Sequence, residues 1–394
     1  MRIALLTYST KPRGGVVHTL NLAEALAAAG ADVTVWSLAR DGDPGFFRPV
    51  EDAVRLELVP FVAIEAESVG QRILRSIDTL RAAFDAARYD IVHAQDCLSA
   101  NAAGRCIRTI HHLDEFSTPE LAACHERAII EPYARICVSA AVAAEVRAGW
   151  GFEPTVIPNG VDFERFAAAA GPDAAGQRQA WRNRLGRYVL AVGGIEPRKG
   201  SIDLLEAFAL LADQDLQLVF AGGETLFDYR DYRARFTARA DELGLAPVIL
   251  GAVADADLPS LVAAAAAVPF FSRKEGFGLA AMEALAAGVP VVARDLPVLR
   301  EVFDDAVDYV STPGQLAAAL RAALPTDPAR RARGRAVASR YRWADAARAH
   351  LDFYAALSTT QPSHRPTTTS TWSAAPIPPL QGLTTRSVIA RPSG

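Results

Sequence analysis

Residues 268–283 read Val268-Pro-Phe-Phe-Ser-Arg-Lys-Glu-Gly-Phe-Gly-Leu-Ala-Ala-Met-Glu283. The apolar start predicts a buried strand that ends at Phe271, and the alanine-rich end predicts a helix that begins at Leu279. Gly276 and Gly278 lie in the loop between them and allow the backbone to approach a ligand closely. A strand, a glycine-spaced loop and a helix in this order are typical of an open parallel sheet that binds its ligand at its strand ends.

Two glutamates, Glu275 and Glu283, stand eight positions apart in this stretch. The amides at a helix start lack intrahelical acceptors and carry positive potential, which favours a phosphate. Glu283, about one turn into the helix, is placed to accept two hydrogen bonds from a vicinal diol such as ribose. Glu275, before the helix, is placed for hydroxyls of a second sugar. Either glutamate alone is explained as an ordinary solvated residue; the pair with the glycines predicts a nucleotide diphosphate sugar as the ligand.

Strands and helices alternate along the chain, which predicts parallel sheets covered by helices. We expect strands in the first half at residues 3–7, 32–37, 90–93, 107–111 and 136–139, with helices at 17–29 and 71–88. Further strands are expected at 188–192, 216–221, 248–250, 268–271 and 289–293, followed by a last helix from Tyr341 or Trp343 to about Leu357. Residues 167–186 are interpreted as a link between two sheets. Two open sheets predict two Rossmann-like α/β domains that face a cleft.

The composition narrows the possible partners and locations. The chain has 394 residues, 51% of them hydrophobic, which suffices for two domains with real cores. A net charge of −4 gives no reason to expect nucleic acid as a partner. The four cysteines, Cys97, Cys106, Cys124 and Cys137, form no closely spaced pair, so we expect reduced thiols and a cytoplasmic location.

Membrane attachment has one candidate element. No apolar run is long enough to span a bilayer as a helix; the longest covers residues 261–271. The helix expected at 71–88 has an apolar stripe bordered by arginines, which leaves peripheral membrane contact open. A helix that covers a sheet with its arginines in water explains the same pattern.

The stretch from Glu275 to Glu283 resembles the paired-glutamate signature of the retaining glycosyltransferases of family four, which have the GT-B fold. Other stretches resemble this family in the same order: Gly14-Gly15, Asp90-Ile-Val-His-Ala-Gln-Asp96, Thr109-Ile-His111, Val138-Ser139, Pro158-Asn-Gly-Val-Asp162 and Glu196-Pro-Arg-Lys-Gly200. The likeness covers residues 1 to about 357. It implies an enzyme of the hexosyltransferase type (EC 2.4) that moves a sugar from a nucleotide diphosphate sugar to an acceptor hydroxyl.

The resemblance also assigns roles to individual residues. Lys199 matches the lysine that grips the donor diphosphate, Glu275 the residue that faces the transferred sugar, and His111 a histidine near the reacting carbon; these are the expected catalytic residues. Glu283 matches the residue that holds the ribose. The full donor-binding set expected is Gly14, Gly15, Arg198, Lys199, Glu275, Gly276, Phe277, Gly278, Leu279 and Glu283. For His93, Asp96 and Ser139 a packing or strand-end role explains the sequence equally well.

One position departs from the family pattern. Family members usually carry an arginine just after the glycine that ends the first strand of the second domain, and Gly194 stands at that place here. Arg198, next to Lys199, is the other cation available for the diphosphate. Losing one such charge costs a few kcal/mol of transition-state stabilisation in comparable sites.

The resemblance implies a division of the chain and a mechanism. Residues 1–166 would form the acceptor-side domain, joined by a returning helix at about 341–357, and residues 167–340 the nucleotide-sugar domain. Residues 358–394, rich in Thr, Ser and Pro, are expected to be disordered. The implied reaction retains the anomeric configuration by front-face attack, with no metal ion and no cofactor. Cys124 and His125 with His111 and His112 are interpreted as scattered polar residues rather than metal ligands.

Three alternative functions remain open at this point. A dinucleotide-dependent oxidoreductase would explain paired open sheets, but no Gly-x-Gly-x-x-Gly follows the first strand. A GT-B sugar-nucleotide epimerase would bind the same donor and form product without an acceptor. A non-catalytic nucleotide-sugar-binding protein is the third alternative, because of Gly194. The sequence predicts neither the nucleotide base, the sugar nor the acceptor.

Overall fold

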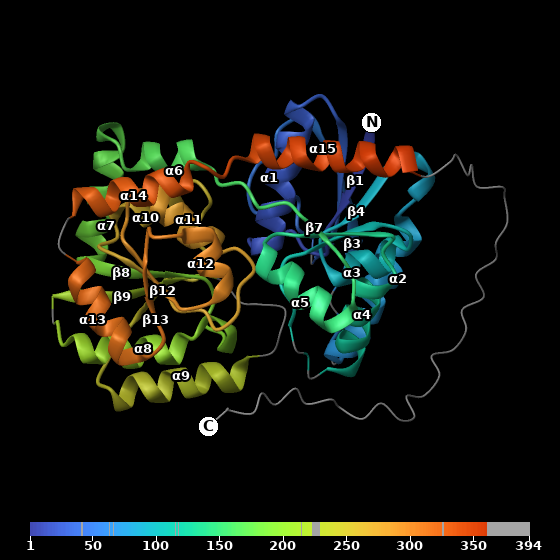
Figure 1. The fold of residues 1–394 in the computed structure, drawn as a ribbon. Helices are drawn as coiled ribbons and strands as arrows, with labels where there is room; N and C mark the ends of the chain where they lie inside the picture. Colours follow the sequence, from blue (N-terminus) through green and yellow to red (C-terminus); the bar gives the residue numbers. More distant parts are fainter. Residues whose placement is uncertain are drawn as a thin grey trace, which may run out of the picture. The chain divides into compact units, whose positions relative to one another are not determined.

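The computed structural model describes residues 1–40, 42–62, 64–65, 67–114, 116, 118–213, 215–222, 229–324 and 327–360 (Figure 1). Met1–Tyr354 form one compact unit. Most of the tail predicted at 358–394 lies outside the described residues, which end at 360. None of the helices in these ranges combines the length and the apolar character that a bilayer crossing requires.

The first sheet in the described ranges has seven parallel strands in the order β3-β2-β1-β4-β5-β6-β7. Their bounds are β1 (Arg2–Leu6), β2 (Asp32–Arg40), β3 (Val54–Phe61), β4 (Ile91–Ala94), β5 (Ile107–Ile110), β6 (Ala134–Cys137) and β7 (Thr155–Val156). Strands β1, β4 and β5 are almost wholly buried, as expected for parallel strands covered on both faces. The order of the first six strands is that of the Rossmann fold.

The second half repeats this order. Its strands are β8 (Arg187–Val192), β9 (Leu216–Ala221), β10 (Val248–Ile249), β11 (Val268–Phe270), β12 (Val291–Arg294) and β13 (Asp308–Val310). Within the described residues they form two three-stranded sheets, β10-β9-β8 and β11-β12-β13. An isolated parallel bridge between Val189 and Ala267 joins β8 to the segment before β11. The resulting order confirms the predicted α/β class with two Rossmann-like open parallel sheets.

Helices connect the strands throughout. The first group is α1 (Gly14–Ala28), α2 (Val69–Ala83), η1 (Ala86–Arg88), α3 (Cys97–Ala103), α4 (Pro119–Ile130) and α5 (Ala140–Trp150). The second is α6 (Phe163–Ala169), η2 (Pro172–Ala174), α7 (Ala175–Leu185), η3 (Pro197–Lys199), α8 (Ser201–Leu211), α9 (Arg230–Glu242), α10 (Leu258–Ala264), α11 (Leu279–Ala286), α12 (Pro297–Phe303), α13 (Pro313–Ala323), α14 (Pro328–Ala338) and α15 (Trp343–Thr360).

Three sequence predictions differ from the structure. Residues 167–186 were interpreted as a link, but α7 fills most of this range and packs on α10, where Trp181 Nε1 donates to Ser260 Oγ at 3.0 Å. The helix predicted at 71–88 ends at Ala83, because Phe84 has an extended backbone. Strand β3 was not predicted; it contains Pro60, which is tolerated there because β3 is an edge strand.

Helix α15 lies beside α1 (Figure 1). The ring centroids of His350 on α15 and His18 on α1 are 6.4 Å apart, and the hydroxyl of Tyr354 lies 2.7 Å from Nδ1 of His93 on β4. Ala347 and Tyr354 are fully buried, and their spacing of seven positions places them on one face of α15. The last described helix therefore packs on elements from the start of the chain.

Candidate active site

The predicted site residues follow the carboxyl ends of strands near the reversal of strand order in each sheet. Gly15 comes after β1 and His111 after β5, while Lys199 comes after β8 and Glu275 after β11. The order reverses between β1 and β4 and between β8 and β11, which is where open α/β sheets bind ligands. The topology thus gathers residues that are far apart in the sequence.

Two cations converge on one carboxylate oxygen. Nζ of Lys199 lies 2.6 Å from Oε1 of Glu275, and Nη1 of Arg198 lies 3.4 Å from the same oxygen. The Glu275 side chain is largely buried. Burial alone would raise the pKa of Glu275, but the charges of Lys199 and Arg198 and the hydrogen bond from Lys199 lower it to about 2. Glu275 is therefore ionised at neutral pH.

Backbone contacts hold these groups in place. Arg273 in the loop after β11 donates its amide to the carbonyl of Arg198 at 2.7 Å, and Nη1 of Arg198 donates to the carbonyl of Lys274 at 3.3 Å. Arg294 on β12 donates from Nε to the carbonyl of Phe271 at 3.2 Å. The loop that carries Glu275 is thus fastened both to η3 and to β12, so the geometry is set by the protein itself.

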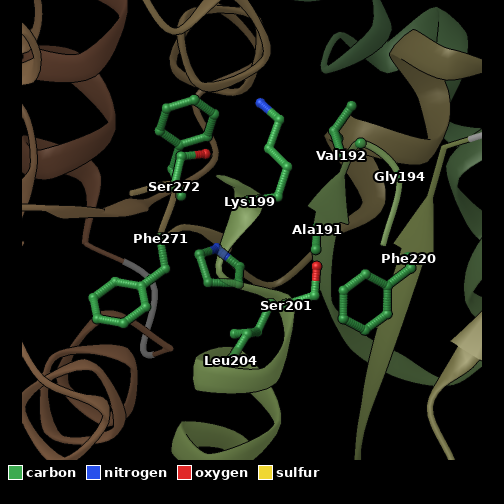
Figure 2. Close-up of a pocket in the computed structure, with 12 residues that line it drawn as sticks. Ala191, Val192, Gly194, Lys199, Ser201, Leu204, Phe220, Phe271 and Ser272 are labelled. Carbon is green, nitrogen blue, oxygen red and sulfur yellow. The ribbon is translucent and has the colours of Figure 1, made fainter. Parts of the chain in front are cut away.

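A small cavity lies beside Lys199, between the ends of β8 and β11 (Figure 2). Figure 2 shows the Lys199 side chain rising between Ser272 on one side and Val192 and Gly194 on the other. The cavity measures about 20 Å³, room for about one water molecule, so it is not itself the donor site. Gly194 contributes no side chain to its wall, and Lys199 is the cation that projects there.

The start of α11 is open to an anion. Gly278 is the N-cap with a φ of 91°, and a Cβ at this position would lie 2.7 Å from Cζ of Phe303. Glycine is therefore required here, and it provides no side-chain cap. Among the described residues, the amides of Leu279 and Ala280 have no hydrogen-bond acceptor. Unpaired amides at a helix start form an anion-binding position.

Glu283 lies one turn further into α11 and is half-buried. Its carboxyl group makes no hydrogen bond or ion pair within the described part of the chain. Burial raises the pKa of Glu283 to about 8; Arg165 opposes this shift, while Asp162 and Asp255 add to it. The carboxyl group is therefore largely protonated at neutral pH and can both donate and accept hydrogen bonds.

A polar groove of about 420 Å³ adjoins the charges around Glu283. Its lining is almost entirely polar: Asn21, Glu24, Arg48, Pro49, Val50, Glu51, Asp52, Asp162, Arg165 and Asp255. Arg165 is held there by Asp255, with Nη2 2.7 Å from Oδ2. None of the site residues predicted from the sequence lines this groove, although its size falls in the usual range of ligand sites.

On the side of the first sheet, Gly15 lies against the ring of His111. A Cβ on Gly15 would be 3.7 Å from both Cδ2 and Nε2 of that ring. The ring of His18 meets His111 edge-on at a centroid distance of 4.7 Å. Nδ1 of His18 lies 2.9 Å from Oδ1 of Asn159; because a carbonyl oxygen only accepts, His18 donates from Nδ1.

Both histidines are neutral. Burial lowers the pKa of His18 to about 3 and that of His111 well below its ordinary value. Their Nε2 atoms are buried without a hydrogen-bond partner in the described residues. His111 therefore presents an uncharged imidazole beside Gly15.

The loop that carries Glu275 touches His111 directly. A Cβ on Gly276 would lie 1.5 Å from the carbonyl oxygen of His111 and 3.3 Å from Cγ2 of Val138. Only glycine fits at this contact. The structure thus brings together Gly15, His111 and Gly276, next to the group formed by Lys199 and Glu275.

Other predicted residues have different surroundings. The ring of Phe277 is buried in the core and meets Tyr341 edge-on at 5.2 Å, so only its backbone is left for a ligand. Gly14 is exposed, and a Cβ there would meet nothing within 4 Å. Asp96 and Ser139 cap α3 and α5. The described residues contain no group of three or more His, Cys, Asp or Glu that could hold a metal ion.

Two residues of the site were not predicted from the sequence as contributors. His18 lies in the first turns of α1, where a histidine looks like any polar helix residue, and only the fold brings it to His111. Asn159 belongs to the Pro158-Asn-Gly-Val-Asp162 stretch, which carried the family resemblance without indicating that Asn159 would bind His18. Because His18 and Asn159 are 141 positions apart, the sequence did not indicate that they pair.

The chain matches two family models. Residues 12–165 match the model described as Glycosyltransferase Family 4, and residues 177–340 match Glycosyl transferases group 1. The chain is 30% identical over 414 residues to the D-inositol 3-phosphate glycosyltransferase of Xylanimonas cellulosilytica, covering 92% of this chain and 98% of that protein. It is also 30% identical over 375 residues to the phosphatidyl-myo-inositol mannosyltransferase of Mycobacterium tuberculosis, covering 87% and 93%.

Solved structures show the same fold. Sucrose-phosphate synthase from Thermosynechococcus elongatus superimposes with a TM-score of 0.74 at 21% identity, covering 91% of this chain and 100% of that one. The Anabaena protein HepE in complex with UDP and glucose gives 0.68 at 20% identity, covering 90% and 99%. The fold and the matched families define a glycosyltransferase with the GT-B fold. The chain belongs to glycosyltransferase family 4 and is a hexosyltransferase of class EC 2.4.

Proposed function

We propose that this protein transfers a sugar from a nucleotide diphosphate sugar to an acceptor hydroxyl, with retention of the anomeric configuration and without a metal ion or cofactor. The convergence of Lys199 and Arg198 on Oε1 of Glu275, beside the uncapped start of α11, carries the proposal. Two cations and unpaired amides around one position suit a diphosphate. A carboxylate at the same position suits the hydroxyls of a sugar.

The donor would lie along residues of the second half of the chain. Its diphosphate would bind between Nζ of Lys199 and the amides of Leu279 and Ala280, and its ribose diol would bind the carboxyl group of Glu283. The transferred sugar would contact Glu275, near His111. The acceptor would bind on the side of residues 1–166, which is the division of roles that the sequence predicts for residues 1–166 and 167–340.

In the transfer step, the bond between the anomeric carbon and the diphosphate oxygen breaks, and its electron pair goes to the diphosphate. The acceptor oxygen bonds to the anomeric carbon on the same face, and its proton passes to the departing phosphate oxygen. Lys199 and Arg198 stabilise the negative charge that develops. His111 stays neutral because of its burial, so it contacts the sugar without adding charge.

The relatives suggest which substrates to test first. Their names specify an inositol 3-phosphate or a phosphatidyl-myo-inositol as acceptor and, in one case, mannose as the transferred sugar. HepE was crystallised with UDP and glucose. We propose a phosphorylated inositol as the acceptor class of this protein.

A thermal-shift panel tests the donor. UDP, GDP, ADP and TDP and their sugars would be added to the wild type, to Glu283→Ala and to the exposed control Glu242→Ala. One nucleotide is expected to raise the melting temperature of the wild type and of the control but not of Glu283→Ala. No stabilisation by any of them would contradict the proposal.

A transfer assay with the selected donor and inositol 3-phosphate tests the acceptor and the mechanism. The anomeric configuration of the product is read by NMR, and the rate is measured with and without EDTA. An inverted product, or activity abolished by EDTA and restored by a divalent cation, would contradict retention or metal independence respectively. Turnover of the donor to an epimer in the absence of acceptor would contradict transfer.

A further inference from the structure

Helix α5 receives a carboxylate at its first turn from the distant helix α12. The amide of Ala140 donates to Oε1 of Glu301 at 2.7 Å, and the amide of Ala141 donates to Oε2 at 2.9 Å. Helix α5 follows β6 of the first sheet, whereas α12 follows β12 in the second half of the chain. Glu301 therefore binds an element 160 positions away in sequence.

This contact completes the cap of α5. The first amides of a helix have no intrahelical acceptor. The side chain of Ser139, the N-cap, accepts from the amide of Val142 at 3.3 Å and so serves the third position of the helix. Glu301 serves the first and second. A carboxylate is well suited to this place, because both of its oxygens accept and the helix start carries positive potential.

The same region of the first sheet contacts the loop that carries Glu275. Val138, which precedes Ser139 directly, lies 3.3 Å from a Cβ built on Gly276. Glu145 on α5 lies 3.8 Å from Nζ of Lys274, in a pair whose side chains are both partly exposed. Exposed pairs of this kind contribute little. Glu301 is exposed as well, but it accepts two main-chain hydrogen bonds at 2.7 and 2.9 Å, so among the described residues its contacts with α5 are shorter than that of Lys274.

We propose that Glu301 is a positioning residue for the transfer reaction: its carboxylate fastens α12 to the start of α5. This contact keeps Gly276, in the loop that carries Glu275, against His111. If the two halves of the chain separate, the amides of Ala140 and Ala141 exchange the exposed carboxylate of Glu301 for water. The contact is made of main-chain donors on one side and a single side chain on the other. One substitution therefore removes it without changing the core.

Hydrogen exchange resolved to single amides tests the contact on the full chain. In Glu301→Ala, the amides of Ala140 and Ala141 should exchange at least tenfold faster than in the wild type, whereas Val142 keeps its protection from Ser139. Glu301→Asp, one methylene shorter, should restore protection of one of the two amides. Asp305→Asn, an exposed acidic residue just beyond α12, is the matched control and should leave all three unchanged.

Small-angle scattering separates positioning from simple capping. In a positioning role, Glu301→Ala gives a larger radius of gyration than the wild type and the Asp305→Asn control, at unchanged circular dichroism. Faster exchange of both amides together with this expansion supports the proposal. Unchanged exchange would overturn it, and so would faster exchange at an unchanged radius of gyration, because Glu301 would then cap α5 and do nothing more. Neither measurement requires the donor, so their outcome is independent of the donor and acceptor proposed above. With a donor in hand, Glu301→Ala should lower kcat for sugar transfer at an unchanged KM, and an unchanged kcat would overturn the positioning role.

Discussion

The backbone of Gly276 lies directly against the carbonyl oxygen of His111, so closely that a Cβ on Gly276 would come within 1.5 Å of that oxygen. Gly276 belongs to the loop that carries Glu275, and His111 directly follows strand β5 of the first sheet. This contact determines how far the group formed by Lys199 and Glu275 stands from the neutral imidazole of His111. The obstacle is a backbone atom, so no side-chain rotation can relieve the clash that a larger residue at position 276 would make.

Gly276→Ala should therefore reduce transfer strongly while the protein remains folded. The added methyl group displaces the loop from His111 by about 1 Å or more, and misplacement on that scale costs on the order of 100-fold in rate. The measurement is kcat for sugar transfer together with the melting temperature. Gly314→Ala is the control, because a Cβ there meets nothing within 4 Å. Wild-type activity in Gly276→Ala would show that the contact with His111 is not needed for turnover.

Lys199 and Arg198 should contribute unequally to catalysis. Lys199 lies 2.6 Å from Oε1 of Glu275 and Arg198 lies 3.4 Å from it, so Lys199 is the closer cation to the proposed diphosphate. Removing one fixed donor of this kind costs on the order of 100- to 1,000-fold in kcat. Lys199→Met should show that loss, and Arg198→Met a smaller one of about tenfold. The values are compared as kcat and kcat/KM for the donor.

The comparison of Lys199→Met with Arg198→Met also tests whether Arg198 replaces the arginine that is missing at Gly194. If Arg198 takes the place of the arginine that the family usually has, Arg198→Met must impair transfer. Introducing the missing cation as Gly194→Arg should then partly rescue Arg198→Met. Full activity of Arg198→Met would show that Lys199 and the amides of α11 suffice for the diphosphate.

The sequence pattern predicted the presence of most strands well and their exact boundaries less well. Strands such as β9 are short apolar runs that end in glycines, and buried parallel strands need that composition, so their positions were readable. Strand β3 was missed, because Arg55 and Glu57 alternate with apolar residues and Pro60 follows, a pattern that fits an edge strand rather than a buried one. Helix α7 was missed, because its polar composition is typical of a linker as well as of a surface helix.

The candidate site was predictable as a set of motifs and not as a geometry. Glu275 and Lys199 each stood in a recognisable stretch, and their salt bridge follows from the adjacency of β8 and β11, which the strand order fixes. The contact between His18 and Asn159, and that between Glu301 and Ala140, depend on how separate elements pack. No local spacing in the sequence encodes such pairs.

The protonation of Glu283 should appear in the pH dependence of stability. Burial raises the pKa of Glu283 to about 8, above its unfolded value, so the folded state binds the proton more tightly. The resulting stability is fully present below pH about 4.5 and is lost as pH rises towards 8. Glu283→Gln, which keeps the neutral shape, should therefore gain melting temperature relative to the wild type between pH 5 and pH 8.5.

The control for this prediction is Glu242→Gln, an exposed carboxylate on α9. Its melting temperature should follow that of the wild type across the range. Parallel curves for Glu283→Gln and the wild type would show that Glu283 is ionised in the folded protein at neutral pH.

Acid should destabilise the protein through a group of buried histidines. His18, His93, His111 and His350 form a series of ring contacts with centroid distances from 4.7 to 6.4 Å. Burial lowers the pKa of His18 to about 3 and of His350 to about 4, and the other two lie well below the ordinary value. The unfolded chain binds these protons near pH 6.5, so stability is present above that pH and is lost as pH falls.

His350→Leu isolates one of these protons. Nδ1 of His350 bonds only the carbonyl of Ala346 within its own helix, and Nε2 is buried without a partner in the described residues, so leucine fits the site without stranding another polar side chain. The slope of unfolding free energy against pH between 6 and 4.5 should fall by about 1.4 kcal/mol per pH unit relative to the wild type. Arg348→Gln, exposed on the same helix, should keep the wild-type slope. Equal slopes in His350→Leu and the wild type would mean that His350 is already protonated in the folded protein. That result would contradict the prediction that these four histidines are neutral when buried.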